Sequence, residues 1–257
     1  MKLNFDARFF NFLSEIESFP KTQRKAFKAI SWLLRWKIVT IPLFAIECIL
    51  AAILWRPPIP FIHLIVKSMT GFAGYYIRAC YYCTRAKKWS GNIIIDEDVI
   101  FENIGEYEFD EFIQIDKRVI IGCESMSIGK GVHIAMGTII GKGGRVVLKD
   151  FSGISYGCIL IPCSEKISHR CGPMIPYKER EIVKGCIILE KNSIIFSGSI
   201  IFHNMVIGEG AIVSAGMVVS KHVKDWKIAF MDCVKDRKII AETPNYEQIQ
   251  SNRRDRK

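Results

Sequence analysis

Five histidines are the side chains of this sequence best suited to proton transfer near neutral pH: His63, His133, His169, His203 and His222. Imidazole is the one side chain whose ordinary pKa lets it accept and release a proton in that range. The sequence shows no cluster of metal ligands at a recognised spacing, no phosphate-binding loop and no dinucleotide motif. We therefore expect general acid–base chemistry and predict no metal site.

A repeat of six residues predicts the elements that would position these histidines. Aliphatic side chains occupy every sixth position from Leu189 to Val219, and the same spacing runs from Ile128 to Ile140 and from Leu148 to Leu160. Weaker copies lie at Ile95 and Phe101 and at Ile115 and Ile121. Small or medium residues follow each aliphatic of the long run by four positions: Ser193, Ser199, Met205, Ala211, Met217 and Val223.

A period of six matches neither the 3.6 residues of an α-helix nor the two of a strand. It matches a coil with three short flat faces, in which the aliphatic points into a triangular prism and the smaller residue fills the corner. Each coil of about 18 residues needs neighbours on which to stack. We predict a mainly β protein with a parallel β-helix over residues 91–240, rather than a β-sandwich with alternation of period two.

Residues 162–184 have no six-residue phase and contain Pro, charged residues and His169. A long excursion from a regular coil is a common place for functional residues. We expect this loop to contribute to a site, and we expect residues 241–257 to form a polar tail.

The charge of the chain is segregated. The net charge is +10, and the whole excess lies in residues 1–90, where 14 Lys and Arg face 4 Asp and Glu. This pattern argues against a nucleic-acid partner, which would not require such segregation. The nine Cys are not densely spaced, which indicates reduced thiols in a cytosolic setting. Cys80 and Cys83 form a single CxxC motif without a second pair, and we interpret them as half-buried helix residues.

Residues 1–90 predict a basic helical module. The stretch Ile38 to Trp55 is 18 residues long and apolar apart from Glu47, and six basic residues precede it: Lys21, Arg24, Lys25, Lys28, Arg35 and Lys37. Three interpretations stay open, namely a transmembrane span, a helix or hairpin lying in the cytoplasmic leaflet, and a buried packing helix. Residues 71–88 predict a Tyr-rich helix suited to a membrane surface or to docking on the next domain. An anionic membrane that contacts residues 21–88 is therefore an expected partner.

The strings IGKGVHIAMGTIIGKGG and ILEKNSIIFSGSIIFHNMVIGEGAIVSAGMVVSKHV resemble the hexapeptide-repeat acyltransferases, above all the bacterial polysaccharide and sugar O-acetyltransferases. The resemblance covers residues 91–240. It implies a left-handed parallel β-helix, a homotrimer with active sites between neighbouring prisms, and acetyl-CoA as co-substrate.

The resemblance also implies a histidine general base. His169 is the first candidate because the family places a base in the excursion loop, and His133 is the second because relatives share its HIA string. His203 is a third, since relatives have Pro-Gly at positions 203 and 204. The family's Trp after the loop is replaced by Ile194, which is a departure from the pattern.

Coenzyme A would lie along the C-terminal coils. By resemblance, the backbone around Ser197-Gly198 and Ser214-Ala215-Gly216 would contact its pantetheine arm, and Lys221 and Lys235 would lie near its phosphates. The family's G-x-P-A-K turn survives only as Lys235.

The leading hypothesis is an acetyl-CoA-dependent O-acetyltransferase that modifies a hydroxyl of a sugar, a lipid-linked glycan or a surface polysaccharide. It would work in the cytoplasm at the inner face of the cell membrane. Two alternatives stay open: a β-helix that has lost catalysis and serves as a scaffold, and an N-acetyltransferase of an amino-sugar nucleotide.

Overall fold

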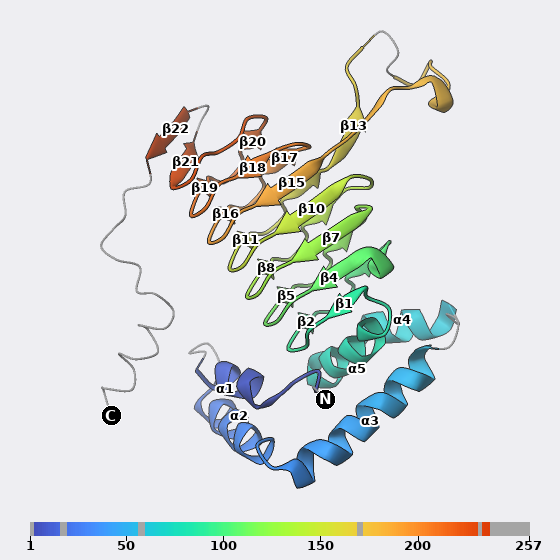
Figure 1. Ribbon diagram of the computed structural model, residues 1–257, viewed down its shortest axis with the longest axis vertical. Helices are drawn as coiled ribbons and strands as arrows, with labels where there is room; N and C mark the ends of the chain where they lie inside the picture. Colours follow the sequence, from blue (N-terminus) through green and yellow to red (C-terminus); the bar gives the residue numbers. More distant parts are fainter. Residues whose placement is uncertain (1–2, 16–19, 56–59, 169–171, 231–232, 237–257) are drawn as a thin grey trace.

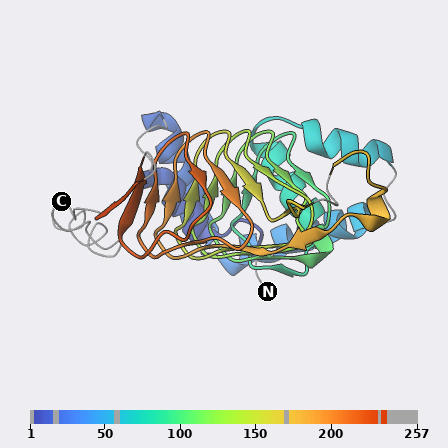
Figure 2. The same cartoon turned by 90° about the horizontal axis from the view of Figure 1, so that it is seen from above.

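The chain forms a parallel β-solenoid of about seven turns preceded by a helical region (Figure 1). A computed structural model describes residues 3–15, 20–55, 60–168, 172–230 and 233–236. The five helices lie at the N-terminal end of the solenoid, which Figure 2 shows as coils following one another along its axis. The helices are α1 (Ala7–Glu15), α2 (Lys21–Leu33), α3 (Lys37–Trp55), α4 (Pro60–Ser68) and α5 (Gly71–Cys83).

The solenoid has three faces, each a sheet whose neighbouring strands come from successive coils. Face A contains β1 (Lys88–Trp89), β4 (Tyr107–Phe109), β7 (Ser125–Ile128), β10 (Arg145–Leu148), β15 (Cys186–Leu189) and β18 (Val206–Ile207). Face B contains β2 (Ile94–Ile95), β5 (Gln114–Ile115), β8 (His133–Ile134), β11 (Gly153–Ile154), β16 (Ile194–Ile195), β19 (Ile212–Val213), β21 (Lys227–Phe230) and β22 (Cys233–Asp236). Face C contains β3 (Ile100–Phe101), β6 (Ile120–Ile121), β9 (Ile139–Ile140), β12 (Ile159–Ile161), β17 (Ile200–Phe202) and β20 (Val218–Val219).

The six-residue repeat points inward, as the sequence predicts. Within face B, Ile115 pairs with Ile134, Ile154 with Ile195, and each of these side chains is buried. All these neighbours are parallel, apart from the last pair, β21 with β22. The prediction of a mainly β parallel β-helix is confirmed, and the solenoid is consistent with the left-handed form expected from the resemblance.

The smaller residues four positions later fill the corners of the prism. Ser193 and Ser199 are buried, and each hydroxyl donates to a carbonyl three residues earlier, at 2.6 Å in Ser193 and 2.8 Å in Ser199. A local hydrogen bond of this kind satisfies a polar group that the core could not otherwise accept. Polar corner residues therefore do not interrupt the apolar interior.

The excursion from the coils is an antiparallel hairpin formed by β13 (Cys163–Glu165) and β14 (Ile182–Lys184), and it projects away from the prism (Figure 1). Arg180 stabilises the loop that joins β13 to β14. Its guanidinium lies 2.8 Å from Glu165 and also donates to the carbonyl of Ile175. Glu165 accepts a further hydrogen bond from the backbone N–H of Gly172. Glu165 therefore organises the loop.

Helix α5 covers the first coil of the solenoid. Arg78 is buried and donates from Nε to the carbonyl of Ile95 on β2, at 2.8 Å. Tyr82 is buried against Phe101 of β3, with ring centroids 4.9 Å apart. Because an uncovered first coil would expose its core to water, a docked helix closes that end. Of the two roles expected for residues 71–88, docking on the next domain is the one observed.

Helix α3 packs against the N-terminal segment and α5 through the face that carries Glu47. The Glu47 carboxylate is buried and accepts the backbone N–H of Asn4 at 3.0 and 3.2 Å. Within the part of the chain that the structure describes, no helix combines the length and apolar character needed to cross a bilayer.

Candidate functional site

His133 is the histidine that the fold places beside both a carboxylate and a cavity. It begins strand β8 on face B, and its side chain points outward because the following residue, Ile134, fills the prism. Its Nε2 lies 2.9 Å from Oδ2 of Asp116, and the imidazole is about half exposed, at 48%. A substrate can therefore reach the ring while a carboxylate fixes its orientation.

Asp116 is held ionised by several donors. Gln114 donates from Nε2 to Oδ1 of Asp116 at 2.9 Å, and the backbone N–H of Met136 also points to this carboxylate. Burial raises the pKa of Asp116, but the hydrogen bonds from His133 and Gln114 outweigh it, so the pKa lies below its ordinary value. An ionised Asp116 accepts the Nε2 proton of a neutral His133 and leaves Nδ1 as the basic nitrogen.

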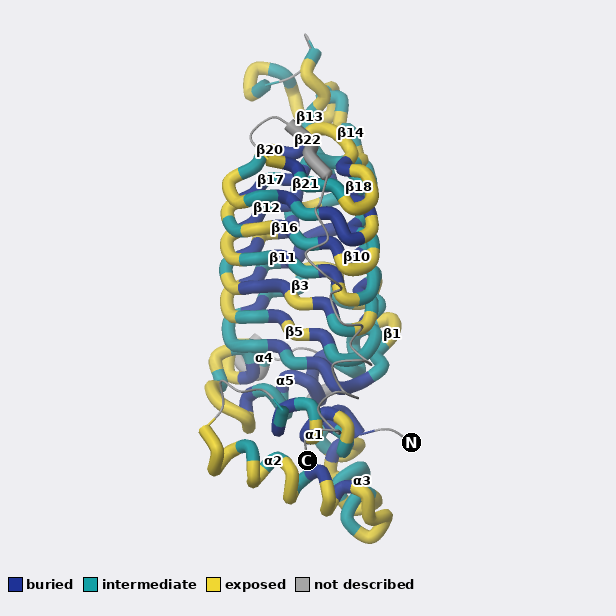
Figure 3. The backbone as a smooth tube through the Cα atoms, turned by 90° about the vertical axis from the view of Figure 1, so that its left-hand side faces the viewer, coloured by how far each residue is buried: buried dark blue, intermediate teal, exposed yellow. Residues whose placement is uncertain are grey.

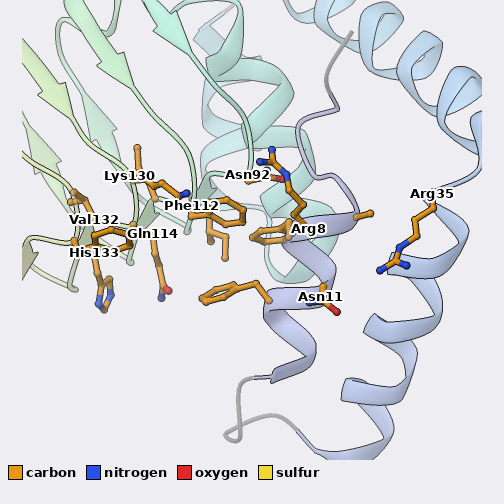
Figure 4. A pocket seen from close by; sticks show the side chains of 16 residues that line it. Arg8, Asn11, Arg35, Asn92, Phe112, Gln114, Lys130, Val132 and His133 are labelled. Atoms are coloured by element: carbon orange, nitrogen blue, oxygen red, sulfur yellow. The ribbon is translucent and has the colours of Figure 1, made fainter. Parts of the chain in front are cut away.

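A cavity of about 620 Å³ adjoins His133 (Figure 4). Helix α1 and the connection between α2 and α3 form one wall, and the corner between faces A and B forms the other. The lining combines aromatic rings with polar and basic side chains, including Arg8, Asn11, Phe12, Arg35, Phe112, Gln114, Lys130, His133 and Phe151. Mostly apolar walls with a few convergent polar groups are typical of small-molecule sites.

Two basic side chains of the cavity lining lie close to an aromatic ring. The Arg8 guanidinium and the Lys130 ammonium each lie 5.7 Å from the centroid of the Phe112 ring. Arg8 also forms ion pairs with Asp6 at 2.8 Å and Glu111 at 3.1 Å, so its charge is balanced. Lys130 forms no ion pair with any residue that the structure describes. The cavity thus offers an aromatic surface and a positive charge to a ligand.

The edge between faces B and C lies on the side of β8 opposite the cavity, and it exposes the glycine backbone of several coils. The N–H of Gly198 donates to the carbonyl of Tyr156 at 2.9 Å, and the N–H of Gly216 donates to that of Ser197 at 2.9 Å. The expected coenzyme A residues Ser197, Gly198, Ser214, Ala215 and Gly216 therefore lie together on this corner. A side chain added at Gly198 or Gly216 would meet no atom within 4 Å, so an elongated ligand can approach the backbone.

Lys221 lies apart from this corner, because the strand β20 separates it from Gly216 across face C. It is exposed and begins the next corner of the prism. The backbone of Lys235 belongs to β22, opposite Ile228. The glycine corner lies on the same edge of the solenoid as the end of β8, two and three coils beyond His133, whereas Lys221 lies at a different edge.

His169, the first candidate base, lies outside the described residues. His203 is on an exposed turn with Nδ1 3.4 Å from the Asn204 amide, and His222 accepts the N–H of Val206 at 3.1 Å. His63 lies 3.3 Å from the Tyr81 hydroxyl, where burial lowers its pKa. Among the described histidines, only His133 has both a carboxylate partner and a neighbouring cavity.

Strand β8 is only two residues long, so His133 lies between two corners of different character. On one side is the cavity with its aromatic and basic lining, and on the other is the column of exposed glycines. A ligand in the cavity can reach the imidazole directly, whereas a ligand at Gly198 would have to extend along the edge across two coils to reach it. Such an arrangement suits a transfer between two bound molecules with His133 as the base.

Sequence reasoning missed Asp116, Gln114 and the contribution of α1. Gln114 precedes the inward Ile115 just as His133 precedes the inward Ile134, and the two pairs are in register. Counting one coil back from His133 would have found Gln114, and Asp116 two residues on. No pattern in the sequence links α1 to this corner, because that contact depends on packing between distant segments.

No protein-family model matches the sequence, and no curated protein does. Among solved structures, a mutant of AntD, an N-acyltransferase from Bacillus cereus, in complex with dTDP-4-amino-4,6-dideoxyglucose and coenzyme A is 29% identical. That match covers 67% of this chain and 93% of AntD, with a TM-score of 0.56. AntD in complex with dTDP and 3-hydroxybutyryl-CoA is 28% identical, covering 66% and 89%, with a TM-score of 0.54.

The hexapeptide-repeat acetyltransferase VCA0836 from Vibrio cholerae, in complex with acetyl-CoA, is 15% identical over 79% of this chain and 90% of its own, with a TM-score of 0.46. The AntD structures that this chain resembles are those of an acyltransferase bound to coenzyme A or to 3-hydroxybutyryl-CoA.

Proposed function

We propose that this protein transfers an acyl group from an acyl-CoA thioester to a sugar acceptor, with His133 as the general base. The observation that carries the proposal is the His133–Asp116 pair beside the cavity, on a solenoid whose same edge exposes Gly198 and Gly216 two and three coils further along. The thioester arm lies along the corner that contains Gly198 and Gly216. The acceptor enters from the cavity.

His133 acts through Nδ1, since its Nε2 proton is donated to Asp116. Nδ1 takes the proton of the attacking amine or hydroxyl as the new bond to the thioester carbonyl carbon forms. The carbon–sulfur bond then breaks, and the imidazolium returns the proton to the leaving thiolate. Asp116 stabilises the imidazolium between these steps and keeps the ring in place, as a positioning residue.

The acceptor that we propose first is a nucleotide-activated amino sugar. AntD supports this class, since it is an N-acyltransferase and was crystallised with a dTDP-amino sugar. The cavity supplies what such a ligand needs: Phe112 and Phe151 offer rings to a nucleobase, and Lys130 offers charge to phosphate. This role of the cavity was absent from the sequence analysis, which placed O-acetylation first.

O-acetylation of a sugar hydroxyl is the second candidate. A hydroxyl loses its proton only during attack, so it depends more on a positioned base than an amine does. The carboxylate-oriented imidazole of His133 supplies that base. Self-association into a homotrimer belongs to the proposal as well, with a neighbouring subunit completing the site.

The test is an assay of thiol release with acetyl-CoA or 3-hydroxybutyryl-CoA, using dTDP-4-amino-4,6-dideoxyglucose or unmodified sugars as acceptors. The proposal predicts acceptor-dependent release of coenzyme A and an acylated sugar in the product. Identification of the product as amide or ester distinguishes the two candidates. Absence of transfer together with no thermal stabilisation by coenzyme A would favour the scaffold alternative, because saturating ligand at 100 times its Kd should add about 2.7 kcal/mol.

A further inference from the structure

Helix α3 exposes apolar side chains on the side opposite its packing contacts. On α3, Ile38, Ile41, Ile46 and Ile49 recur at helical spacing and all are exposed, Ile38 at 81%. Further exposed apolar side chains lie on α2, α4 and the α2–α3 connection: Trp32, Leu33, Trp36, Leu64 and Ile65. We call the face formed by Trp32, Trp36 and the four isoleucines of α3 the outer face.

The one acidic residue between Pro20 and Ile95 is turned away from the outer face. Glu47 lies on the opposite side of α3, where it is buried and bonded to Asn4. Leu43 and Phe44 share this inner side and pack against the helical core. The inner side of α3 thus has its partners within the chain, and the outer face has none among the described residues.

Basic residues border the outer face. Lys21, Arg24, Lys25 and Lys28 follow one another along α2, and the α2–α3 junction adds two more, Arg35 and Lys37. None of the six forms an ion pair with a residue that the structure describes, and all but Arg24 are exposed. Figure 3 shows this exposed layer along α2 and α3, at the end of the molecule away from the excursion hairpin.

We propose that the outer face docks on an anionic lipid bilayer, lying in its interface with the axes of α2 and α3 along the surface. Apolar side chains flanked by Lys and Arg and accompanied by Trp are the features that such interfacial helices share. Anionic headgroups supply the negative charge that the six basic side chains lack.

Charge also decides between a bilayer and a second copy of this chain. Pairing of two outer faces would bring twelve basic side chains together without an exposed acid from residues 20–95 to balance them. Such a contact is repulsive at ordinary ionic strength. A bilayer accepts the same face with its charges satisfied, so we commit to lipid.

Docking would have a consequence for the cavity. Arg35 lies at the α2–α3 connection and also lines the cavity beside His133 (Figure 4). A bilayer at the outer face would therefore hold the cavity close to the membrane surface. This inference concerns location and stands independently of the proposed acyl transfer.

The test is co-sedimentation of the full chain with vesicles of equal parts phosphatidylcholine and phosphatidylglycerol, compared with vesicles of phosphatidylcholine alone. We expect binding to the anionic vesicles that weakens as NaCl is raised. The double variant Arg24→Glu with Lys28→Glu should bind them on the order of thirtyfold more weakly, since each basic residue near the surface contributes about 1 kcal/mol. The matched control, Lys178→Glu with Lys224→Glu, makes the same change of charge on exposed residues of the hairpin and solenoid and should bind like wild type.

A second pair of variants tests the apolar part. Ile38→Asp with Ile49→Asp should abolish pelleting, whereas Ile167→Asp with Met174→Asp, on exposed residues of the hairpin, should not. Unchanged thermal unfolding shows that each variant is folded. The proposal is overturned if the wild-type chain does not pellet with anionic vesicles, or if both pairs behave alike. It is also overturned if the Ile38 and Ile49 variant changes the oligomeric state while lipid binding persists, because the face would then be an interface between chains.

Discussion

Nε2 of His133 lies 2.9 Å from Oδ2 of Asp116, one coil earlier in the solenoid. The two residues are distant in sequence, and the stacking of β5 under β8 brings them together. Each of the two residues is next to an inward isoleucine, so both side chains face outward, and His133 lines the cavity. Asp116 thus fixes the orientation of an imidazole that a ligand can reach, as the proposed base role requires.

Replacement of His133 by Ala should reduce acyl transfer on the order of 10²–10⁴-fold, because the acceptor would lose its proton acceptor. Binding of coenzyme A should change little, since the contacts proposed for it are backbone groups of the glycine corner. His203→Ala is the matched control, as His203 is partly exposed and lies outside the cavity. Steady-state kinetics with coenzyme A titration measures both effects, and equal turnover of the two variants would remove His133 from the base role.

Asp116→Asn should lower kcat more than it raises KM, because it disturbs the orientation of His133 without touching the acceptor. The pKa of Asp116 is depressed in the folded chain, so its charge stabilises the fold above the ordinary value of 3.8 and that stability is lost as pH falls through the folded pKa. The free energy of unfolding of wild type should therefore be lower below about pH 3.8 than at neutral pH. The variant should lack the part of this decrease that comes from Asp116. Denaturant unfolding against pH measures it, and parallel curves for both proteins would contradict the assignment.

Glu47→Gln should flatten the pH dependence of stability above pH 4.5. Burial raises the pKa of Glu47, against the donors Asn4 and Tyr76, which favour its charged form. A raised folded pKa contributes stability that is complete below the ordinary value of 4.5 and is lost as pH rises through the folded pKa.

A glutamine keeps an oxygen acceptor for the Asn4 N–H and does not titrate. The variant should therefore melt at or above the temperature of wild type at pH 8 and close to it at pH 4.5. A Glu47→Gln protein that is less stable at pH 8 than at pH 4.5, by the same margin as wild type, would show that another group is responsible.

Ile195→Ala should destabilise the solenoid by about 2–5 kcal/mol, because it leaves a cavity in the fully buried core. Ile194→Ala, one position away, should cost less than about 1 kcal/mol, since that side chain faces outward. Urea unfolding of the two variants tests the inward phase of the repeat. Similar losses for both would mean that the hexads do not define the core.

The solenoid was predictable because its rule is local. Every sixth residue from Leu189 to Val219 must be aliphatic to fill the prism, and this periodicity is visible without knowing any distant contact. The helical region follows no such rule. Glu47 contacts Asn4, and Phe112 contacts Arg8, although the partners lie far apart in the sequence. These contacts therefore depend on the packing of whole elements.

The candidate site was only partly predictable for the same reason. His133 and the glycine corner follow from the repeat, since coil register stacks Gly198 and Gly216 in one column. The cavity does not follow from it, because α1 supplies one wall from outside the solenoid. His169 was placed ahead of His133 by resemblance, and the carboxylate partner that favours His133 became visible only in three dimensions.

A crystal structure of the protein with bound coenzyme A would decide whether His133 is the base, because it locates the sulfur atom. We expect the pantetheine arm along the corner of Gly198 and Gly216, with the sulfur placed so that a thioester carbonyl and an acceptor near His133 approach within about 3–3.5 Å. A sulfur atom beside the excursion hairpin, beyond reach of His133, would contradict it and return the base role to another residue.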